Sequence, residues 1–427
     1  MKTLSIALLP AHKASLFSSR QAVARRMVFA VLKQLQFGCL RLHEGDEVQV
    51  FGQPAEASDL VADIRVLDAQ LYSDLVFGGS VGAGEAYMSG YWETNNLTSV
   101  IRIFVRNLPV VDSLDAKQSR MGKWLLHFFH VFNRNSKAGS RKNISAHYDL
   151  GNDFFRLFLD ETLMYSAAIY PEPNAPLQLA ATYKLQRVCE KLQLNAQDHL
   201  LEIGTGWGGM AIYAARHYGC KVTTTTISRE QYECAKARVQ EAGLAGQVEV
   251  LFDDYRDLTG QFSKLVSIEM IEAVGHEHYD QYFSTCSALL KPNGLMLLQS
   301  ITISDQRYEQ ARRSVDFIQR YIFPGGCLPS IAVIAEKLAR KTDMTILGIE
   351  EIGDHYAQTL KHWREAFMAR LDDVRALGFD ERFIRMWEFY LGYCEGGFME
   401  RSIGTAQLLL AKPNYRSAYF SAPESHS

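Results

Sequence analysis

The clearest change of hydrophobic pattern in the chain lies at residues 199–218. An apolar run that contains one acid, Glu202, breaks into a glycine-rich turn, and a pattern with helical spacing follows at once. Gly204, Gly206 and Gly208 have no Cβ, so the turn can adopt left-handed backbone angles and a flat ligand can approach it closely. This strand–turn–helix predicts a site for a nucleotide-like cofactor in a doubly wound sheet.

Apolar runs of strand length alternate with helical patterns from about residue 179 onward. The alternation predicts an α/β fold, with a mainly parallel sheet covered on both faces by helices. Strands are expected at residues 200–204, 221–226, 247–252, 264–269, 294–302, 344–351 and 405–411, and helices at 229–242, 278–290 and 331–340. Residues 304–329 fit neither pattern, and we interpret them as an insertion near the site.

Residues 45–110 have a different pattern, in which short strand-like and helix-like runs are mixed. They predict a small α+β unit, with strands at 47–51 and 64–67 and helices at 69–76 and 97–105. Residues 133–143 are rich in Asn, Ser, Gly, Lys and Arg, which is typical of a linker.

Charge is distributed unevenly along the 427 residues, although the net charge is only −3. Residues 1–43 and 116–148 contain bases and apolar residues but no acid. Such segments can lie on an anionic membrane surface, or they can be amphipathic helices packed on a domain with wet basic faces. A transit peptide is a third interpretation of residues 1–43. The net charge indicates no nucleic-acid partner.

The seven cysteines are scattered and form no C-x-x-C pair, which argues against a structural zinc site or a disulfide framework. We therefore expect reduced thiols, no bound metal and a cytoplasmic location. No apolar run reaches the roughly 18 residues that span a bilayer.

The nature of the cofactor depends on the residues after the second and third strands. A dinucleotide site needs an acid about 20 positions after the glycines, to hold the ribose hydroxyls. Here the second strand ends at Thr226 without an acid, and Gln231 is the next polar group able to bridge two hydroxyls. The third strand is followed by Asp254 and Tyr255, which suit an adenine edge. Together these features favour S-adenosylmethionine over a nicotinamide dinucleotide, and an oxidoreductase remains a remote alternative.

Several segments resemble one family, the cyclopropane-fatty-acyl-phospholipid synthases and mycolic acid cyclopropane synthases. The resemblance covers about residues 75–415 and is carried by residues 146–150, 153–160, 165–166, 202–209, 226–231, 254–257, 321–330 and 355–360. Residues 82–92 are similar to the small N-terminal domain of the bacterial phospholipid enzymes.

The resemblance implies a class I methyltransferase fold with a seven-stranded sheet and a smaller N-terminal α+β domain. We expect the N-terminal domain, with lipid or membrane contact, at residues 1–132, a linker at 133–145 and the catalytic domain at 146–427. The implied cofactor-binding residues are Tyr165, Ser166, Glu202, Gly204, Thr205, Gly206, Trp207, Gly208, Thr226, Ile227, Ser228, Gln231, Asp254, Tyr255 and Arg256.

The family's reaction is transfer of a methyl group from S-adenosylmethionine to the cis double bond of a lipid acyl chain. An alkene is a weak nucleophile, so the two reactants must be held close and in line. The carbocation that results requires a dry pocket with aromatic faces. A base must then remove a proton so that the ring closes, and in the family this base is a bound bicarbonate.

The resemblance places the bicarbonate cradle at Glu272, Tyr356 and the backbone of Ile301. Two positions depart from the family pattern: its usual cysteine after Tyr-Ser is Ala167, and its usual histidine on the fifth strand is Gln299. Either the anion site survives with altered geometry or another base acts. Cys394 aligns with a cysteine once proposed as a nucleophile, although this chemistry needs no thiol.

The expected product is a cyclopropane fatty acyl chain. The alternative is a methyl-branched unsaturated or methylene chain, formed if the proton leaves a different carbon. The expected partners are an unsaturated phospholipid and the anionic inner face of the membrane, with a homodimer kept as a candidate. The altered cradle also leaves a lipid-binding protein without turnover as a competing hypothesis.

Overall fold

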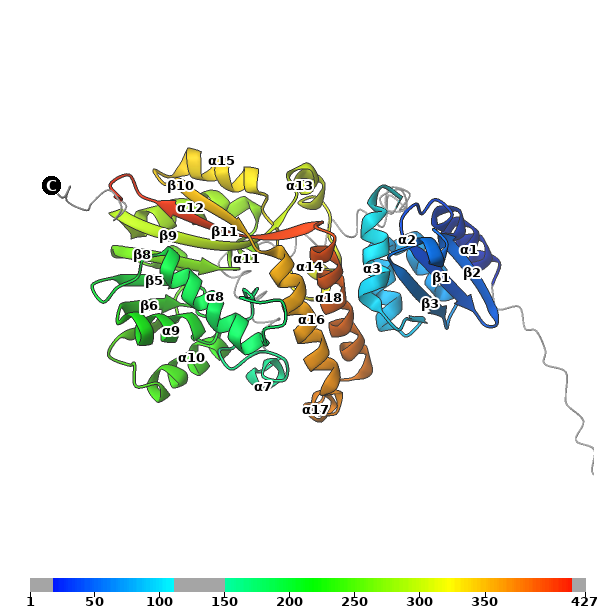
Figure 1. Cartoon of the computed structure of the whole chain (residues 1–427), viewed down its shortest axis with the longest axis horizontal. Helices are drawn as coiled ribbons and strands as arrows, with labels where there is room; N and C mark the ends of the chain where they lie inside the picture. Colours follow the sequence, from blue (N-terminus) through cyan, green and yellow to red (C-terminus); the bar gives the residue numbers. More distant parts are fainter. Residues whose placement is uncertain (1–17, 111–149, 417–427) are drawn as a thin grey trace, which may run out of the picture.

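The computed structural model describes residues 18–110 and 150–416, which form two sheets with helices packed around and between them (Figure 1). The predicted linker at 133–143 and the second basic segment at 116–148 lie outside the described residues. No helix within the described ranges is long and apolar enough to cross a membrane.

The N-terminal unit contains a four-stranded sheet with the order β2-β1-β3-β4. Strand β1 pairs antiparallel with β2 and parallel with β3, and β3 pairs antiparallel with β4. The elements of this unit are α1 (Ser19–Leu32), β1 (Cys39–Glu44), β2 (Glu47–Gly52), β3 (Val61–Val66), α2 (Gln70–Met88), β4 (Trp92–Glu93) and α3 (Leu97–Arg106), with a 3-10 turn at Ala55–Ala57.

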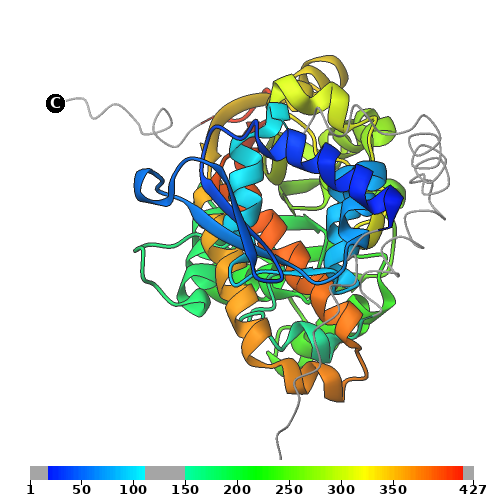
Figure 2. The same cartoon turned by 90° about the vertical axis from the view of Figure 1, so that its right-hand side faces the viewer.

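The first basic segment packs into this unit. Helix α1 begins at a capping box in which the side chains of Ser18 and Gln21 each accept a backbone N–H. Most of the segment's large apolar residues are buried, whereas Val23, Met27 and Phe37 are exposed; the buried ones are Val28, Phe29, Val31, Leu32 and Leu35. For the described part of residues 1–43, the structure therefore favours a helix packed on a domain over an apolar face laid on a membrane (Figure 2).

The second sheet has seven strands in the order β10-β11-β9-β8-β5-β6-β7. Its strands are β5 (His199–Ile203), β6 (Lys221–Thr225), β7 (Val248–Leu251), β8 (Phe262–Ile268), β9 (Leu290–Ile303), β10 (Thr345–Glu351) and β11 (Ile403–Ala411). Strands β5 to β9 pair in parallel, and β11 runs antiparallel between β9 and β10. The predicted doubly wound, mostly parallel sheet is confirmed, and all seven expected strands are present.

Helices cover both faces of this sheet and one of its ends (Figure 1). They are α7 (Asn152–Phe155), α8 (Leu177–Lys191), α9 (Gly209–Tyr218), α10 (Arg229–Glu241), α11 (Ile271–Val274), α12 (Tyr279–Leu289), α13 (Asp305–Ala311), α14 (Phe317–Tyr321), α15 (Ile331–Lys341), α16 (Gly353–Ala369), α17 (Leu371–Ala376) and α18 (Glu381–Met399), with 3-10 turns at Tyr255–Asp257 and His276–His278. The predicted insertion at 304–329 contains α13 and α14 and borders the main cavity.

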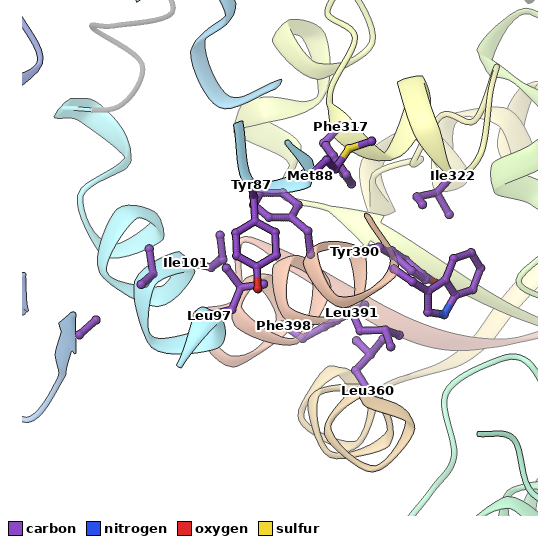
Figure 3. Packing of buried hydrophobic residues seen from close by; sticks show 14 of the residues in the cluster. Tyr87, Met88, Leu97, Ile101, Phe317, Ile322, Leu360, Tyr390, Leu391 and Phe398 are labelled. Carbon is purple, nitrogen blue, oxygen red and sulfur yellow. The ribbon is translucent and has the colours of Figure 1, made fainter. Parts of the chain in front are cut away.

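Helix α18 joins the two units, because α2 and α3 pack directly against it (Figure 3). The close approach of α3 depends on a missing side chain: a Cβ on Gly396 would lie 2.8 Å from Ile101 Cγ2. Ion pairs border the contact, since Arg102 and Arg106 both donate to Glu400, at 2.6 and 2.9 Å. The apolar core of the N-terminal unit therefore continues into α16 and α18.

Candidate active site

A cavity of about 1000 Å³ lies at the carboxyl ends of the central strands of the seven-stranded sheet. Ligands of doubly wound sheets bind at this edge, where the loops after the strands converge. The lining of the cavity extends from the glycine-rich turn to α13, α14, α16 and α18. Val81 of α2 and Val105 of α3 complete it, so the N-terminal unit forms part of the wall.

The glycine-rich turn has the backbone that its sequence predicts. The φ angles of Gly204, Gly206 and Gly208 are 102°, 51° and 85°, in the left-handed region where a side chain is unfavourable. Below the turn, Thr224 Oγ1 donates to Glu202 Oε2 at 2.6 Å and lies 2.7 Å from Thr205 Oγ1. These buried contacts hold the turn against β5 and β6.

The second and third predicted cofactor segments also reach the cavity. Thr226 Oγ1 donates to Gln231 Oε1 at 2.9 Å, which leaves the amide N–H groups of Gln231 for a ligand. Ser228 caps the N-terminus of α10 by accepting from the backbone N–H of Gln231. Asp254 and Arg256 form a buried ion pair of 2.6 Å at the adenine-side loop.

The covering segment lies over the glycine turn. Trp207 Nε1 donates to Asn152 Oδ1 at 2.5 Å, and the Trp207 ring lies 4.9 Å from the ring of Phe155. Tyr165 and Tyr390 share a hydroxyl hydrogen bond of 2.8 Å. All the predicted cofactor-binding residues line the cavity except Gly208 and Ser228, which belong to the turns beside it. Polar groups, a close backbone approach and aromatic walls together fit S-adenosylmethionine.

Glu272 and Ile301 lie together, as the resemblance predicted. Glu272 Oε1 accepts from the backbone N–H of Ile301 at 2.5 Å and from Ser300 Oγ at 3.0 Å. Within the described residues, the Oε2 atom of Glu272 is shielded from solvent and has no hydrogen-bond partner. Burial, with the neighbouring carboxylate of Glu269 as second cause, raises the pKa of Glu272 to about 8.

Glu269 contacts the predicted bicarbonate cradle through Tyr356. Its Oε1 accepts from the backbone N–H of Ala167 at 2.9 Å and from Gln299 Nε2 at 2.7 Å, and its Oε2 accepts from Tyr356 Oη at 2.8 Å. Tyr356, which the resemblance placed in the cradle, and the two positions that depart from the family pattern, Ala167 and Gln299, therefore bind a carboxylate of the chain itself. Bicarbonate does not fit among these donors, because Glu269 already takes their hydrogen bonds.

A chain of amides fixes the orientation of Gln299. Lys191 Nζ can only donate, and it contacts Gln407 Oε1 at 2.5 Å. Gln407 Nε2 must then donate to Gln299 Oε1, at 2.8 Å, so the amide N–H of Gln299 faces Glu269. Glu269 is consequently an acceptor from all three of its partners, which favours its ionised form.

The backbone of Glu269 is unusual. Strand β8 ends at Ile268, and Glu269 follows with a φ of 51°, a left-handed angle that favours glycine. Its own N–H donates to the carbonyl oxygen of Gln299 at 2.8 Å. A glutamate held at such an angle costs about 1 kcal/mol or more, and strained residues of this kind cluster at functional sites.

Buried charges surround Glu269. Burial is the largest influence and leaves the pKa of Glu269 raised, although its three hydrogen-bond donors and the positive charge of Lys184 lower it. Lys184 is fully buried, donates to Ser166 Oγ at 2.9 Å, and has a pKa that burial lowers to about 8. Glu202 lies within the same charge network, and burial raises its pKa to about 8.

Aromatic rings line the space beside these carboxylates. Tyr356 is stacked on Phe398 with ring centroids 4.5 Å apart, and the rings of Tyr165 and Trp363 lie 5.2 Å apart. Cys394 also lines the cavity, but burial raises the pKa of its thiol far above neutrality. A thiolate nucleophile at this position is therefore unfavourable.

Two residues of the site, Glu269 and Lys184, were missed by the sequence interpretation. Glu269 had a detectable signal, because it directly follows a buried strand and lies three residues before Glu272. Lys184 had none, since a lysine in the middle of an amphipathic helix normally faces solvent. Two predicted residues, Ala167 and Gln299, lie behind Glu269 and do not line the cavity.

Comparisons with known proteins show the family to which the chain is similar. Residues 135–408 match the family described as mycolic acid cyclopropane synthetase. The chain is 40% identical to the tuberculostearic acid methyltransferase UfaA1 of Mycobacterium tuberculosis over 345 residues, 78% of this chain and 79% of that protein. It is 38% identical to the cyclopropane-fatty-acyl-phospholipid synthase of Escherichia coli over 359 residues, 82% of this chain and 88% of that protein.

The fold is shared with solved structures. The crystal structure of mycolic acid cyclopropane synthase CmaA1 complexed with SAH and CTAB matches with a TM-score of 0.60 and 32% identity, covering 64% of this chain and 98% of that one. The family match and the site geometry lead to the same assignment: the chain belongs to the mycolic acid cyclopropane synthetase family of S-adenosylmethionine-dependent methyltransferases.

Proposed function

We propose that the protein transfers a methyl group from S-adenosylmethionine to the cis double bond of an unsaturated fatty acyl chain of a phospholipid. The observation that carries this proposal is the continuity of the cavity. One space joins the glycine-rich turn, the carboxylates of Glu269 and Glu272, and an apolar region that includes Val81 and Val105. A cofactor, a base and an acyl chain can therefore meet in it.

The residues of the site have separate tasks in this reaction. The bound cofactor supplies an electrophilic methyl group. The turn at Gly204 and the amide of Gln231 position it, which is worth several kcal/mol in a reaction of a weak nucleophile. The ring faces of Tyr356 and Tyr165 stabilise positive charge on the acyl chain. The apolar wall excludes water that would capture that charge.

The proposed product is a cyclopropane fatty acyl chain, formed when the new methyl carbon loses a proton and closes a ring. A second candidate is a methyl-branched unsaturated or methylene chain. Ala167, Gln299 and the carboxylate of Glu269 favour this candidate, because they replace the anion site predicted for ring formation. The similarity to a tuberculostearic acid methyltransferase also favours it.

We further propose that the protein acts in the cytoplasm at the inner face of the membrane. The cavity lining includes three arginines of the segment around α13: Arg307, Arg312 and Arg313. Arg312 and Arg313 pair with Glu309, which also lines the cavity, so a phosphate would compete with that carboxylate for them. An arginine cluster at the border of an apolar cavity suits the phosphate of a lipid headgroup.

Vesicles test the proposal directly. The purified protein is incubated with ¹³C-methyl-labelled S-adenosylmethionine and phospholipid vesicles that carry cis-monounsaturated chains, and vesicles with saturated chains serve as the control. We expect label in the unsaturated lipid, with the added mass of one ¹³CH₂ unit. Catalytic hydrogenation then separates the products, because a methyl-alkene takes up hydrogen readily and a cyclopropane resists it. Cofactor binding without transfer to any unsaturated lipid would refute the proposal.

A further inference from the structure

We propose that Glu269 is the base of the reaction, a carboxylate built into the chain that replaces a bound bicarbonate. The inference rests on the proposed methyl transfer to an acyl chain. It predicts that turnover needs no bicarbonate and that the proton lost by the product goes to Glu269.

The position of the carboxylate is the first argument. Ala167, Gln299 and Tyr356 reach Glu269 from three different elements: the segment before α8, strand β9 and helix α16. Three donors that converge on one point form an anion site, and the anion present is a side chain. Glu269 is also one of the residues that line the cavity, which places it beside a substrate held there.

The charge of Glu269 is the second argument. The amide chain from Lys191 through Gln407 leaves Gln299 able only to donate to Glu269. Three residues further along the chain, Glu272 holds its shielded oxygen without a partner in the described part of the chain. The three donors and the buried cation Lys184 favour the charged form of Glu269, whereas Glu272, with one carboxyl oxygen unpartnered among the described residues, is placed to carry a proton.

Backbone strain is the third argument. The φ angle of 51° at Glu269 would suit glycine, yet the position holds a long acidic residue whose oxygens use three donors. A structural role does not require a carboxylate buried at an unfavourable backbone angle beside a second carboxylate. A base that must face the reacting carbons does require it.

The step balances without any further reagent. The π electrons of the alkene form the new bond to the methyl carbon as the sulfur–carbon bond breaks, which leaves a carbocation on the adjacent chain carbon. For ring closure, a C–H bond of the transferred methyl group then breaks, its proton goes to an oxygen of Glu269, and its electron pair forms the last ring bond to the cationic carbon. For a methyl-branched alkene, the C–H bond that breaks lies on a chain carbon next to the cation, and its electron pair forms the double bond. A methylene product needs a 1,2-hydride shift that first moves the cation to the methylated carbon, after which the methyl group loses the proton. The proton leaves Glu269 to solvent after the product departs.

Two substitutions at one position test the proposal. Glu269→Gln keeps the size of the side chain and removes the base, and we expect turnover to fall roughly 100-fold or more. Glu269→Gly suits the backbone angle and opens the donor cluster, and we expect a similar loss that added bicarbonate or formate reverses in part. Glu269→Gln should not be rescued, because its amide fills the space. The wild-type protein should turn over equally in CO₂-depleted buffer.

A binding measurement makes the test independent of activity. In ¹³C NMR spectra of labelled bicarbonate, we expect line broadening with Glu269→Gly and none with wild type or Glu269→Gln. If wild type transfers no methyl group to lipid, the proposed function fails, while the NMR result still reports whether Glu269 fills the anion site. Bicarbonate-dependent turnover of wild type, or full activity of Glu269→Gln, would overturn the inference.

Discussion

Tyr356 and Glu269 form a hydrogen bond of 2.8 Å between α16 and the end of β8, with the tyrosine hydroxyl as donor. The two residues are 87 positions apart in the sequence. The phenol ring is held by its stacking on Phe398, so the hydroxyl is aimed at the carboxylate. Tyr356 therefore has two roles: its hydroxyl donates to the proposed base, and its ring forms part of the aromatic wall of the cavity.

Tyr356→Phe keeps the ring and removes this donor. Because the hydroxyl stabilises the charged form of Glu269, its loss should raise the pKa of that carboxyl. A hydrogen bond to a charged group is worth about 1.5–3 kcal/mol, so we expect turnover to fall roughly 10- to 100-fold. The acid limb of the pH–rate profile should move to higher pH. Labelled-methyl transfer between pH 6 and 9 measures both effects.

The control is Tyr218→Phe, at the end of α9 and outside the cavity lining. It should leave the rate and the pH profile unchanged. An unshifted acid limb in Tyr356→Phe would show that this hydroxyl does not act through Glu269.

Glu272 predicts a pH dependence of stability. Its pKa in the folded chain is about 8 because of burial, against about 4.3 for an exposed glutamate. The folded chain therefore binds this proton more tightly, and the contribution to stability is complete below pH about 4 and is lost as pH rises to about 8. Glu272→Gln keeps the acceptor for Ile301 and has no proton to lose.

We expect the free energy of unfolding of wild type, relative to Glu272→Gln, to fall by roughly 2 kcal/mol between pH 6 and pH 8. Urea denaturation at several pH values measures this difference. The exposed residue Glu277 supplies the control variant, Glu277→Gln. Parallel pH curves for wild type and Glu272→Gln would contradict the prediction.

The fold could be predicted largely from the sequence, because its signals are local. The seven strands are apolar runs of strand length, and the glycines at 204, 206 and 208 require left-handed angles. The donor cluster could not be predicted in the same way. Ala167 lies 102 residues from Glu269, and their contact depends on how the covering segment folds over the sheet. The pattern of apolar and basic residues in α1 was ambiguous, because burial and membrane contact demand the same amphipathic helix.

The contact between α3 and α18 makes Gly396 sensitive to a single added methyl group. A Cβ there would lie 2.8 Å from Ile101 Cγ2 and 3.3 Å from the carbonyl oxygen of Thr98. Overpacking of this kind costs about 1–3 kcal/mol, so Gly396→Ala should lower the free energy of unfolding by that amount. Gly348→Ala, on β10 with no atom within 4 Å of the added carbon, is the matched control. Equal urea midpoints for the two variants would rule out tight packing at this contact.

Replacement of Cys394 is expected to change turnover little. Its thiol lines the cavity, but burial raises its pKa and keeps it neutral. Cys394→Ala should therefore retain turnover within about twofold, since loss of a small packing group leaves the base and the donors in place. Cys234→Ala, on α10 and outside the cavity lining, is the comparison. A loss of 100-fold or more with unchanged thermal unfolding would indicate that the thiol takes part in the reaction.

The last prediction is that the carboxylate of Glu269 can be replaced by a site for a bound bicarbonate ion. The triple variant Ala167→Cys, Glu269→Gly, Gln299→His restores the residues of the family pattern and empties the centre of the cluster. A neutral histidine can accept from Gln407 with one ring nitrogen and donate with the other, so the donor toward the centre is kept. We expect this variant to be inactive in CO₂-depleted buffer and to regain turnover as bicarbonate is added. The double variant Ala167→Cys, Gln299→His keeps Glu269 and should not respond to bicarbonate. Turnover is measured by label transfer to lipid. If bicarbonate raises the turnover of both variants, the need for the ion does not depend on the side chain at position 269, and the prediction is wrong.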